Sequence, residues 1–302
     1  MNKVTMKDIA KEAGVSVATV SYVLNNNIKE KIPEETRQRI MNIAKELNYV
    51  PNLAARSLVK RKSGLIGILI SRDYDNEGEW KKCLYTEFIS EIEVILSAMG
   101  YHILIYGIDT GNPNADIIAE RELDGVFVID VDKSFFYKIS NKFTVPIIII
   151  DSRIEDIIFH KILPDFSEAL QLAKEYFEEE DISVISDKYN DKNITMDMKS
   201  SLGREDELLI VQSSNELENF IKNRKNKKLV IINEFLAIMA CKYIEPSDLA
   251  VICTCGCAYL LPDGVKTVIL DNCKKAEIAA EIILDYIDKN YHDNKYTYIK
   301  AE

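Results

Sequence analysis

Residues 4–25 read VTMKDIAKEAGVSVATVSYVLN, and this stretch decides how the first part of the chain folds. Apolar residues recur at steps of three and four before Gly14 and again after it, which predicts two short amphipathic helices. Thr5 and Asp8 form a capping-box-like start for the first helix. Gly14 tolerates the left-handed conformation that ends a helix, and Ser16 can cap the second one. Two short helices around a tight glycine turn are typical of a helix-turn-helix.

A third helix is expected in residues 32–49, IPEETRQRIMNIAKELNY. Pro33 suits the first turn of a helix, and the acidic Glu34 and Glu35 suit its positively polarised N-terminus. A small helical hairpin inside another kind of domain remains the alternative for the first two helices taken alone. If the three helices form one unit, the spacing predicts a shared core of Met6, Ile9, Ala10, Ala13, Val15, Val20, Val23, Leu24, Ile40, Ile43, Ala44 and Leu47.

This N-terminal region resembles the lactose-repressor (LacI/GalR) family of bacterial transcription regulators. The resemblance rests on DIAKEAGVSVATVSYVLN (8–25), EETRQRI (34–40) and KELNYVPNLAARSL (45–58), and it continues to Ile70. It implies a sequence-specific DNA-binding regulator. We expect a repressor that acts as a homodimer on a near-palindromic operator in double-stranded DNA.

Residues 51–63 are expected to form a hinge and linker after the three helices. Its short helical pattern, LAARSL, has too few residues for a stable isolated helix. The resemblance implies that this hinge becomes helical when two copies pack in a widened minor groove, with Leu58 wedged between base pairs and Ala55 and Arg56 in the groove. An ordinary buried role for Leu58 is the alternative, and the polar VKRKSG that follows it disfavours burial.

The outward side chains of the second helix are the expected base-reading residues. Val17 and Ala18 offer apolar contacts that suit thymine methyl groups, and Tyr22 can also form a hydrogen bond with a base edge. Contacts to DNA phosphates, which orient a protein on the duplex, are expected from polar residues nearby. These are Thr5, Thr19, Ser21 and Asn25.

Charge is distributed unevenly along the 302 residues. The first 62 contain twelve Lys or Arg and six Asp or Glu, a net charge of +6, whereas the remainder has a net charge of −17. A basic segment attracts phosphate and an acidic body repels it, so the N-terminal segment alone is expected to contact DNA. The six cysteines show no disulfide spacing, and neither a membrane-spanning segment nor a secretion signal is evident. We therefore expect a cytoplasmic protein without membrane contact.

From Leu65 onward, short apolar runs alternate with helical patterns. Runs such as LIGILI, GVFVID, PIIIID and LAVICT are typical of parallel strands buried on both faces, and a long helix is expected at about 79–99. Two successive sets of strands and helices imply two Rossmann-like lobes. The resemblance identifies them with a periplasmic-binding-protein-like sensor core. The expected divisions are a helix-turn-helix domain (1–50), the hinge (51–63) and the α/β core (64–302), whose lobes are 64–163 and 164–271, with the helix at 272–290 and a C-terminal strand crossing between them.

Ligands of such sheets bind where the strands end, in the cleft between the lobes. Where many sugar-sensing members of the resembled family carry an acidic pair, this chain has Cys255 and Gly256. The segment 187–207 shows neither the arginine-plus-glycine pattern nor the strand-flanking GH pair that is usual at that point. We therefore expect no simple hexose or pentose as the effector, and a core that serves only for dimerisation is the alternative. The residues selected by position for a small-molecule effector are Asp73, Tyr74, Trp80, Tyr85, Asp130, Asp151 and Cys255.

Cys253, Cys255 and Cys257 alternate with other residues at the end of one strand pattern. Alternate residues share a face on a strand, so a soft-metal or thiol-redox site is one interpretation. The usual zinc knuckle has two intervening residues, which does not fit. Cysteine is also a common small core residue, and we favour packing.

Two other classes of protein share such a core. A doubly wound enzyme would carry a dinucleotide, phosphate-loop or nucleophile motif, and none occurs, while His102, His160 and His292 lie far apart in the sequence. A small-molecule-binding protein without a regulatory role would not need the basic N-terminal segment. We therefore expect no enzymatic activity and no cofactor.

Overall fold

The computed structural model describes residues 4–24, 31–47, 49, 62–74, 79–111, 114–178, 181–203 and 207–302. The chain divides into two compact units, Met1–Arg61, which we call the head, and Lys62–Glu302, which we call the core. No helix in these described segments is long and apolar enough to cross a membrane.

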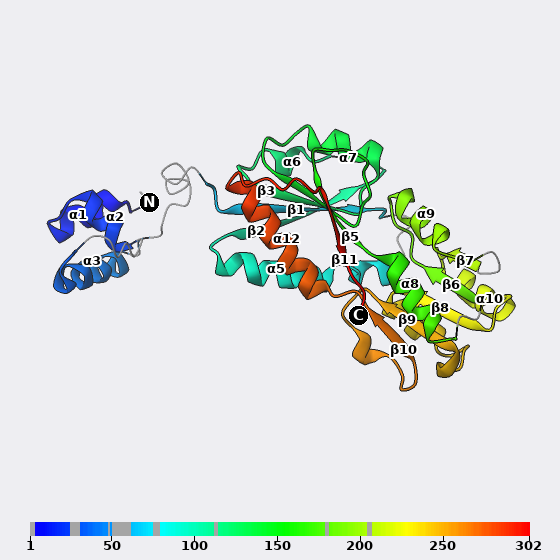
Figure 1. The fold of residues 1–302 in the computed structure, drawn as a ribbon. Coiled ribbons are helices and arrows are strands. Elements are labelled where there is room, and N and C mark those ends of the chain that lie inside the picture. The colour runs from blue at the N-terminus through cyan, green and yellow to red at the C-terminus, as the bar shows by residue number, and fades with distance from the viewer. Residues whose placement is uncertain are drawn as a thin grey trace. The chain divides into compact units, whose positions relative to one another are not determined.

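The described part of the head consists of three helices around one small apolar centre (Figure 1). They are α1 (Met6–Ala13), α2 (Val17–Leu24) and α3 (Glu34–Glu46). The residues expected to face inward do so: seven are buried and the others of that set pack against them. The buried ones are Ile9, Ala10, Ala13, Val20, Val23, Ile40 and Ala44.

Local contacts fix the two turns of the head. Gly14 ends α1 in the left-handed conformation, with φ of 66°. The Thr5 backbone N–H and hydroxyl both donate to Asp8 Oδ2, at 2.8 and 2.7 Å. Ser16 Oγ accepts a hydrogen bond from the Thr19 backbone N–H at 3.0 Å, so the N-cap expected for α2 is confirmed.

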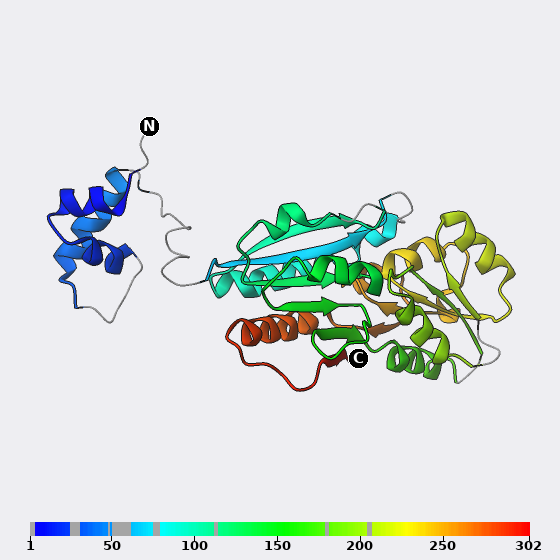
Figure 2. The ribbon, with the colours of Figure 1, turned by 90° about the horizontal axis from the view of Figure 1, so that it is seen from above.

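The first lobe of the core is a six-stranded parallel sheet covered on both faces. Helices α5 (Thr86–Ala98) and α12 (Asn272–Ile287) lie side by side on one face, and α6 (Asp116–Ala119) and α7 (Lys133–Ser140) cover the other (Figures 1 and 2). In spatial order, the strands are β11 (Tyr296–Ile299), β5 (His160–Pro164), β4 (Ile147–Ile150), β3 (Gly125–Ile129), β1 (Leu65–Arg72) and β2 (His102–Asp109).

The second lobe repeats this plan with five parallel strands. Helices α8 (Phe166–Glu175) and α9 (Lys192–Ser200) cover one face, and α10 (Ser214–Asn223) and α11 (Glu234–Ala240) cover the other. The strands, in spatial order, are β10 (Lys266–Ile269), β9 (Leu249–Cys253), β8 (Lys228–Ile232), β6 (Ile182–Ser186) and β7 (Glu207–Ile210).

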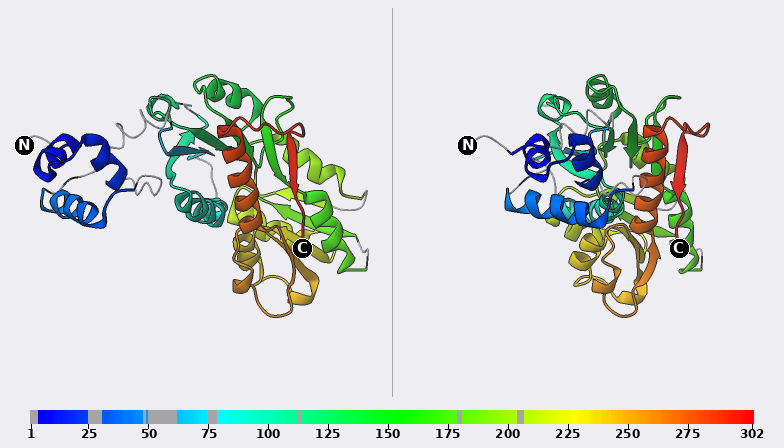
Figure 3. Two further views of the ribbon diagram at one scale, coloured as in Figure 1. Left: turned by 60° about the vertical axis from the view of Figure 1, so that its left-hand side comes forward. Right: turned by 90° about the vertical axis from the view of Figure 1, so that its left-hand side faces the viewer.

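The chain passes between the lobes at three places that are bonded to one another. After β5 it enters the second lobe, after β10 it returns through α12, and β11 then lies beside α12 before the last residues reach back to β10 (Figure 3). Asp165 N–H donates to Ile299 O at 2.9 Å, and Ile269 N–H donates to Glu302 O at 2.7 Å. The three crossings between the lobes are therefore linked to one another by backbone hydrogen bonds.

Strand β5 and helix α9 of the core have no counterpart in the sequence expectations, and one expected helix is divided. Strand β5 contains His160, Lys161 and Pro164, so its sequence is not an apolar run. Lys161 is nevertheless fully buried, and its ammonium group is satisfied by donating to Asp156 O. Helix α9 follows a polar segment. The single helix expected at about 79–99 is wrong, because η1 (Glu79–Cys83), a short 3-10 helix, precedes α5 and directs Trp80 into the second lobe's apolar cluster.

Candidate functional site

The expected base-reading residues lie on the exposed face of α2. Val20 and Val23 are buried against α1 and α3, which fixes the rotation of the helix. Val17 is 41% exposed and Tyr22 is 37% exposed, and Ala18 is also exposed. A short helix that presents small and aromatic side chains outward can enter the major groove of DNA.

Two of the expected phosphate contacts lie on the same helix, and a third precedes α1. Thr19 and Ser21 are half-buried on α2. Thr5 is exposed at the start of α1, and its hydrogen bonds to Asp8 hold the pKa of that carboxyl below its usual value. Asn25, and the hinge residues Ala55, Arg56 and Leu58, lie outside the residues that the structure describes.

In the core, the ends of β3 and β4 carry two buried aspartates. Asp130 and Asp151 both adopt positive φ, 51° and 53°, which turns the chain away from the sheet. Lys81 Nζ lies 2.7 Å from Asp130 Oδ2, and Lys275 Nζ lies 3.1 Å from Asp151 Oδ2. Burial raises the pKa of Asp151, and the charge of Lys275 opposes that rise. Each aspartate expected in the cleft is thus neutralised by a lysine of the same chain.

Trp80 and Tyr85 are buried close to these aspartates. The Trp80 indole N–H donates to Asp187 Oδ1 at 3.0 Å. Burial raises the pKa of Tyr85 well above its usual value, and the charges of Asp130 and Asp151 add to the effect. Burial also raises the pKa of Asp187 to about 6, against the opposing charge of Lys81.

Asp73 and Tyr74 lie outside this buried group. The carboxylate of Asp73 is 3.7 Å from Lys188 Nζ. Tyr74 is 63% exposed, and its hydroxyl packs over Gly107 of β2, where a Cβ would lie only 2.3 Å from the oxygen. The structure therefore brings together Trp80, Tyr85, Asp130 and Asp151 and leaves Asp73 and Tyr74 at the surface.

Sequence reasoning overlooked the second lobe's contribution to this group. The loop between β6 and α9, residues 187–191, carries Asp187, Tyr189 and Asn190 into the cleft. The same rule that selected strand ends in the first lobe applies to β6, because residue 187 directly follows that strand. The overlooked Lys81 and Lys275 belong to helical elements and had no comparable signal.

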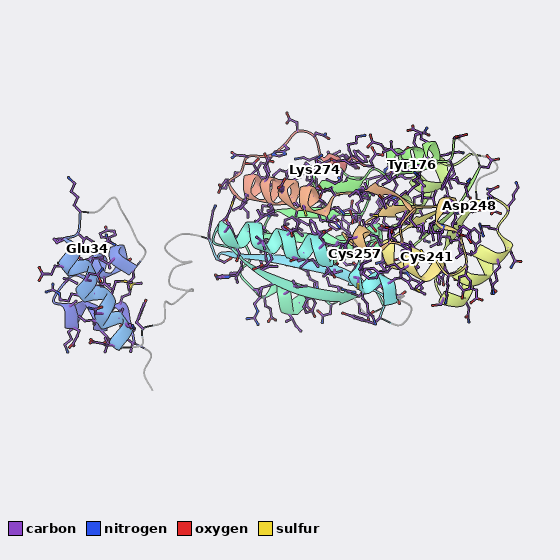
Figure 4. The ribbon with its side chains drawn as sticks, turned by 90° about the horizontal axis from the view of Figure 1, so that it is seen from below. Glu34, Tyr176, Cys241, Asp248, Cys257 and Lys274 are labelled. Carbon is purple, nitrogen blue, oxygen red and sulfur yellow. The ribbon has the colours of Figure 1, made fainter. Side chains whose placement is uncertain are left out.

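The three clustered cysteines do not share one face. Strand β9 ends at Cys253, so the alternation of side chains stops there. Cys253 packs in the cluster under α10 and α11, and Cys255 packs in the cluster under α8 and α9. Cys257, which Figure 4 labels, is half-buried in the following loop. Burial, followed by the charge of Glu234, raises the pKa of both Cys253 and Cys255. Among the described residues, no group of three His, Cys, Asp or Glu side chains could hold a metal ion.

Glu234 explains the shape of the loop after β9. Its carboxylate is fully buried and accepts backbone N–H groups from Thr254, Cys255 and Cys257, at 2.8 to 3.1 Å. Hydrogen bonds from several backbone donors to one carboxylate fix the course of the chain around it. Cys255, expected at the effector position, therefore belongs to a loop that is organised around a carboxylate of the same chain.

Among the described residues, a small cavity lies between the lobes beside Lys275. It has a volume of about 10 Å³, the space of about one water molecule. Pockets for small organic ligands are far larger, at roughly 300–1,000 Å³. The cavity is lined by Leu84, Asp151, Pro164, Phe166, Tyr189, Thr254, Leu270, Asn272 and Lys275.

Two histidines that are distant in the sequence meet at the edge of the first lobe. The rings of His160 and His292 are 5.7 Å apart, and His160 contacts the hydroxyls of Tyr286 and Thr297 at 3.2 and 2.8 Å. Burial, followed by the charges of His292 and Lys295, lowers the pKa of His160 to about 4. This buried neutral imidazole ties α12 to β5 and β11.

Comparison with known proteins gives consistent matches. The bacterial regulatory proteins of the lacI family match at residues 5–52. A probable HTH-type transcriptional repressor, ExuR of Bacillus subtilis, is 34% identical over 60% of this chain and 54% of its own length. The sucrose operon repressor of Klebsiella pneumoniae is 36% identical over 42% of this chain and 37% of its own length. The matched segments thus span about half or less of these relatives.

Solved structures show a similar fold over the whole chain. The lac repressor dimer bound to operator and the anti-inducer ONPF superposes with a TM-score of 0.76 at 15% identity, covering 100% of this chain and 97% of that one. A complex of the transcriptional regulator CelR with cellobiose gives a TM-score of 0.62 at 14% identity, covering 99% and 98%. The expected architecture, a helical head and an α/β core of two lobes, is confirmed.

Proposed function

We propose that this chain, which belongs to the lacI family of bacterial regulatory proteins, is a transcriptional repressor that binds a near-palindromic operator as a dimer. The observation that carries the proposal is the head. Its match to the family covers residues 5–52, and the described part of that match folds as three helices with α2 exposed. The net charge of +6 in the first 62 residues supports phosphate binding.

In this proposal α2 enters the major groove. Val17 and Ala18 contact thymine methyl groups, and Tyr22 reaches a base edge with its ring and hydroxyl. Thr5, Thr19, Ser21 and Asn25 bind phosphates and set the register of the head. At the centre of the operator, Ala55 and Arg56 lie in the minor groove and Leu58 separates two base pairs.

A homodimer is proposed because a near-palindromic site needs two heads. Apolar side chains are exposed on both lobes of the core, as expected of a surface that another subunit covers. They include Val94 (58% exposed) and Ile105 (57%) on the first lobe, and Ile238 (39%), Tyr259 (81%) and Leu260 (48%) on the second. We place the protein in the cytoplasm, where its operator would be, and we propose no enzymatic reaction for it.

A sugar could enter the cavity around Lys275 only if the lobes separated, because that cavity holds about one water molecule. The alternative, a core that dimerises without an effector, is favoured by the internal neutralisation of Asp130 and Asp151. A thiol- or metal-responsive core is disfavoured, because Cys253 and Cys255 pack in different clusters.

Operator binding by the full chain tests the proposal, with Leu58→Ala as the diagnostic variant. The substitution removes the wedge, so specific binding should weaken by about 2–3 kcal/mol, the scale of one unstacked base step. Binding to random DNA rests on Lys and Arg and should keep its affinity and salt dependence. Equal losses of affinity for operator and random DNA would refute the wedge role of Leu58. Absence of any preferred DNA site would refute the proposed repressor function.

A further inference from the structure

Residues 187–191, the loop between β6 and α9 that we call the 187–191 loop, lie against the strand ends of the opposite lobe. Four of its five residues form polar contacts with the first lobe. Asp187 accepts from the Trp80 indole, Lys188 O accepts from Lys81 Nζ, and Asp191 Oδ2 accepts from the Arg153 backbone N–H. These partners come from η1 and from the segment after β4, which lie at the carboxyl edge of the sheet.

Asn190 makes the central contacts of the loop. Its backbone N–H donates to Asp130 Oδ1 at 2.7 Å. Its side-chain amide donates to Asp130 O at 2.9 Å and Oδ2 at 3.2 Å, and lies 3.4 Å from Ser71 O. Ser71 is the penultimate residue of β1, and Asp130 follows β3, the strand next to β1. In parallel α/β sheets this edge is where small molecules are held by polar groups.

Other polar groups of the edge are also engaged from within the chain, whereas three buried atoms there, Ser71 Oγ, Tyr85 Oη and Asp187 Oδ2, have no hydrogen-bond partner among the described residues. Lys81 joins Asp130 to the 187–191 loop, because its ammonium group contacts both. Tyr189 is buried, and the centroid of its ring lies 5.7 Å from that of Phe166. The ammonium group of Lys81 lies over the ring of Tyr189, 5.9 Å from its centroid. A buried ion pair that also has hydrogen-bond partners on both sides is costly to break. The loop thus closes the cleft with contacts of the kind that a bound polar ligand provides.

We propose that the 187–191 loop is a built-in ligand: the Asn190 amide fills the effector position at the ends of β1 and β3, and the core is closed without a small molecule. The inference rests on the proposed function only in treating the core as the regulatory part of a repressor. It changes how that part works, since closure is a property of the sequence and not a response to an effector.

Trp80 provides a direct measure of closure. It is the single tryptophan of the chain, it originates in the first lobe, and it is 6% exposed in the second lobe's apolar cluster. Separation of the lobes would move its indole away from Asp187 and into water. Emission of the full-length protein and its quenching by acrylamide, both measured without DNA, therefore report on closure independently of operator binding.

Three variants isolate the Asn190 side chain. Asn190→Ala removes the amide, Asn190→Asp keeps its volume but places a carboxylate against Asp130, and Asn223→Ala changes an exposed asparagine on α10 as the matched control. Losing hydrogen bonds to a charged group should shift the closed–open equilibrium by roughly a hundredfold. Acetamide can replace the missing group in Asn190→Ala, whereas acetate would be repelled by Asp130.

The unmodified protein should show blue emission and weak quenching with no ligand present, and Asn223→Ala should match it. Both Asn190 variants should emit further to the red and be quenched several-fold more strongly, with unchanged far-ultraviolet circular dichroism. Added acetamide, and not acetate, should restore the closed signal of Asn190→Ala. Strong quenching of the unmodified protein that a sugar relieves would overturn the inference, as would Asn190 variants with unchanged quenching. If Asn190→Ala does not fold, the emission and quenching of Asn190→Asp test the inference in the same way.

Discussion

The head and the cleft of this molecule differ in the range of the contacts that build them. In the head, caps and turns join residues three apart, such as Thr5 with Asp8 and Ser16 with Thr19. In the cleft, Asn190 contacts Asp130, 60 residues away, and Lys275 contacts Asp151, 124 residues away. Short-range contacts can be inferred from spacing in the sequence, and long-range contacts depend on the completed fold. The contacts of the head can therefore be predicted from the sequence, whereas those of the cleft cannot.

The two regions also differ in how they treat charge. The charged groups of the described head are exposed, apart from the half-buried Arg37, and Asp8 has its pKa lowered by hydrogen bonds from Thr5. In the cleft, Asp130, Asp151 and Asp187 are buried together with Lys81 and Lys275. Exposed charges tune encounters with DNA, whereas buried ones determine which arrangement of the lobes is stable.

The largest effect expected from this contrast is a pH-dependent gain of stability in Asp187→Asn. The pKa of Asp187 is raised from 3.8 to about 6 by burial. Between these values the folded state keeps a proton that the unfolded state loses, so this carboxyl makes the protein less stable as pH rises from 4 to 6. Asparagine does not titrate. The free energy of unfolding of Asp187→Asn, minus that of the unmodified protein, should rise by about 2 kcal/mol from pH 4 to pH 7.

Urea unfolding followed by circular dichroism at several pH values measures this difference. Asp293→Asn, which changes an exposed aspartate, serves as the matched control. The lowered pKa of His160 contributes with the opposite sign, but it is present in both proteins and cancels. A flat difference curve for Asp187→Asn would show that Asp187 is already charged in the folded protein at pH 4.

The sequence predicted most of the strands and helices but few contacts of the cleft. Periodicity identified the core of the head because Ile9, Val20 and Ile40 recur on helical faces. Continuous apolar runs identified β1, β3 and β4, because strands that are buried on both faces consist of such runs. Strand β5 was missed because Lys161 interrupts its apolar pattern, and its burial depends on Asp156 and the ring of Tyr296. Sequence periodicity does not reveal contacts of this kind, which allow a lysine to be buried.

Positions at strand ends were predictable, and their partners were not. Asp130 and Asp151 follow apolar runs, so the sequence placed them in the cleft. That Lys81 and Lys275 neutralise them follows only from the packing of η1 and α12 against the sheet. The cysteines show the same limit: β9 ends at Cys253, which separates residues that strand alternation had placed on one face.

A smaller effect, confined to the head, is expected from Tyr22→Ala. Removing the ring and hydroxyl deletes one base contact, so discrimination at one or two positions in each half-site should fall by about 1 kcal/mol. Affinities for operators with single base changes measure this loss. Tyr74→Ala, which removes an exposed tyrosine of the core, should leave base preference unchanged. A uniform drop in affinity across all sites would show that Tyr22 does not read bases.

No effect at all is expected when simple sugars are added to the protein. Sugar hydroxyls need polar partners when they leave water, and here Asp130 and Asp151 are already paired with lysines. A true effector at 100 times its dissociation constant would add about 2.7 kcal/mol of stability. A thermal-shift panel of hexoses and pentoses should therefore leave the melting midpoint unchanged. One sugar that raises the midpoint by several degrees and releases the operator would contradict this expectation.

Selection of binding sites from random double-stranded DNA by the purified full chain tests most directly whether the head is a specific DNA reader. We predict that the selected sites share a two-fold symmetric sequence with two half-sites, one for each head of a dimer. The same sequence should be selected with and without added sugars, because the core is closed by its own residues. Recovery of DNA with no shared sequence, bound only through its phosphates, would contradict the proposed function.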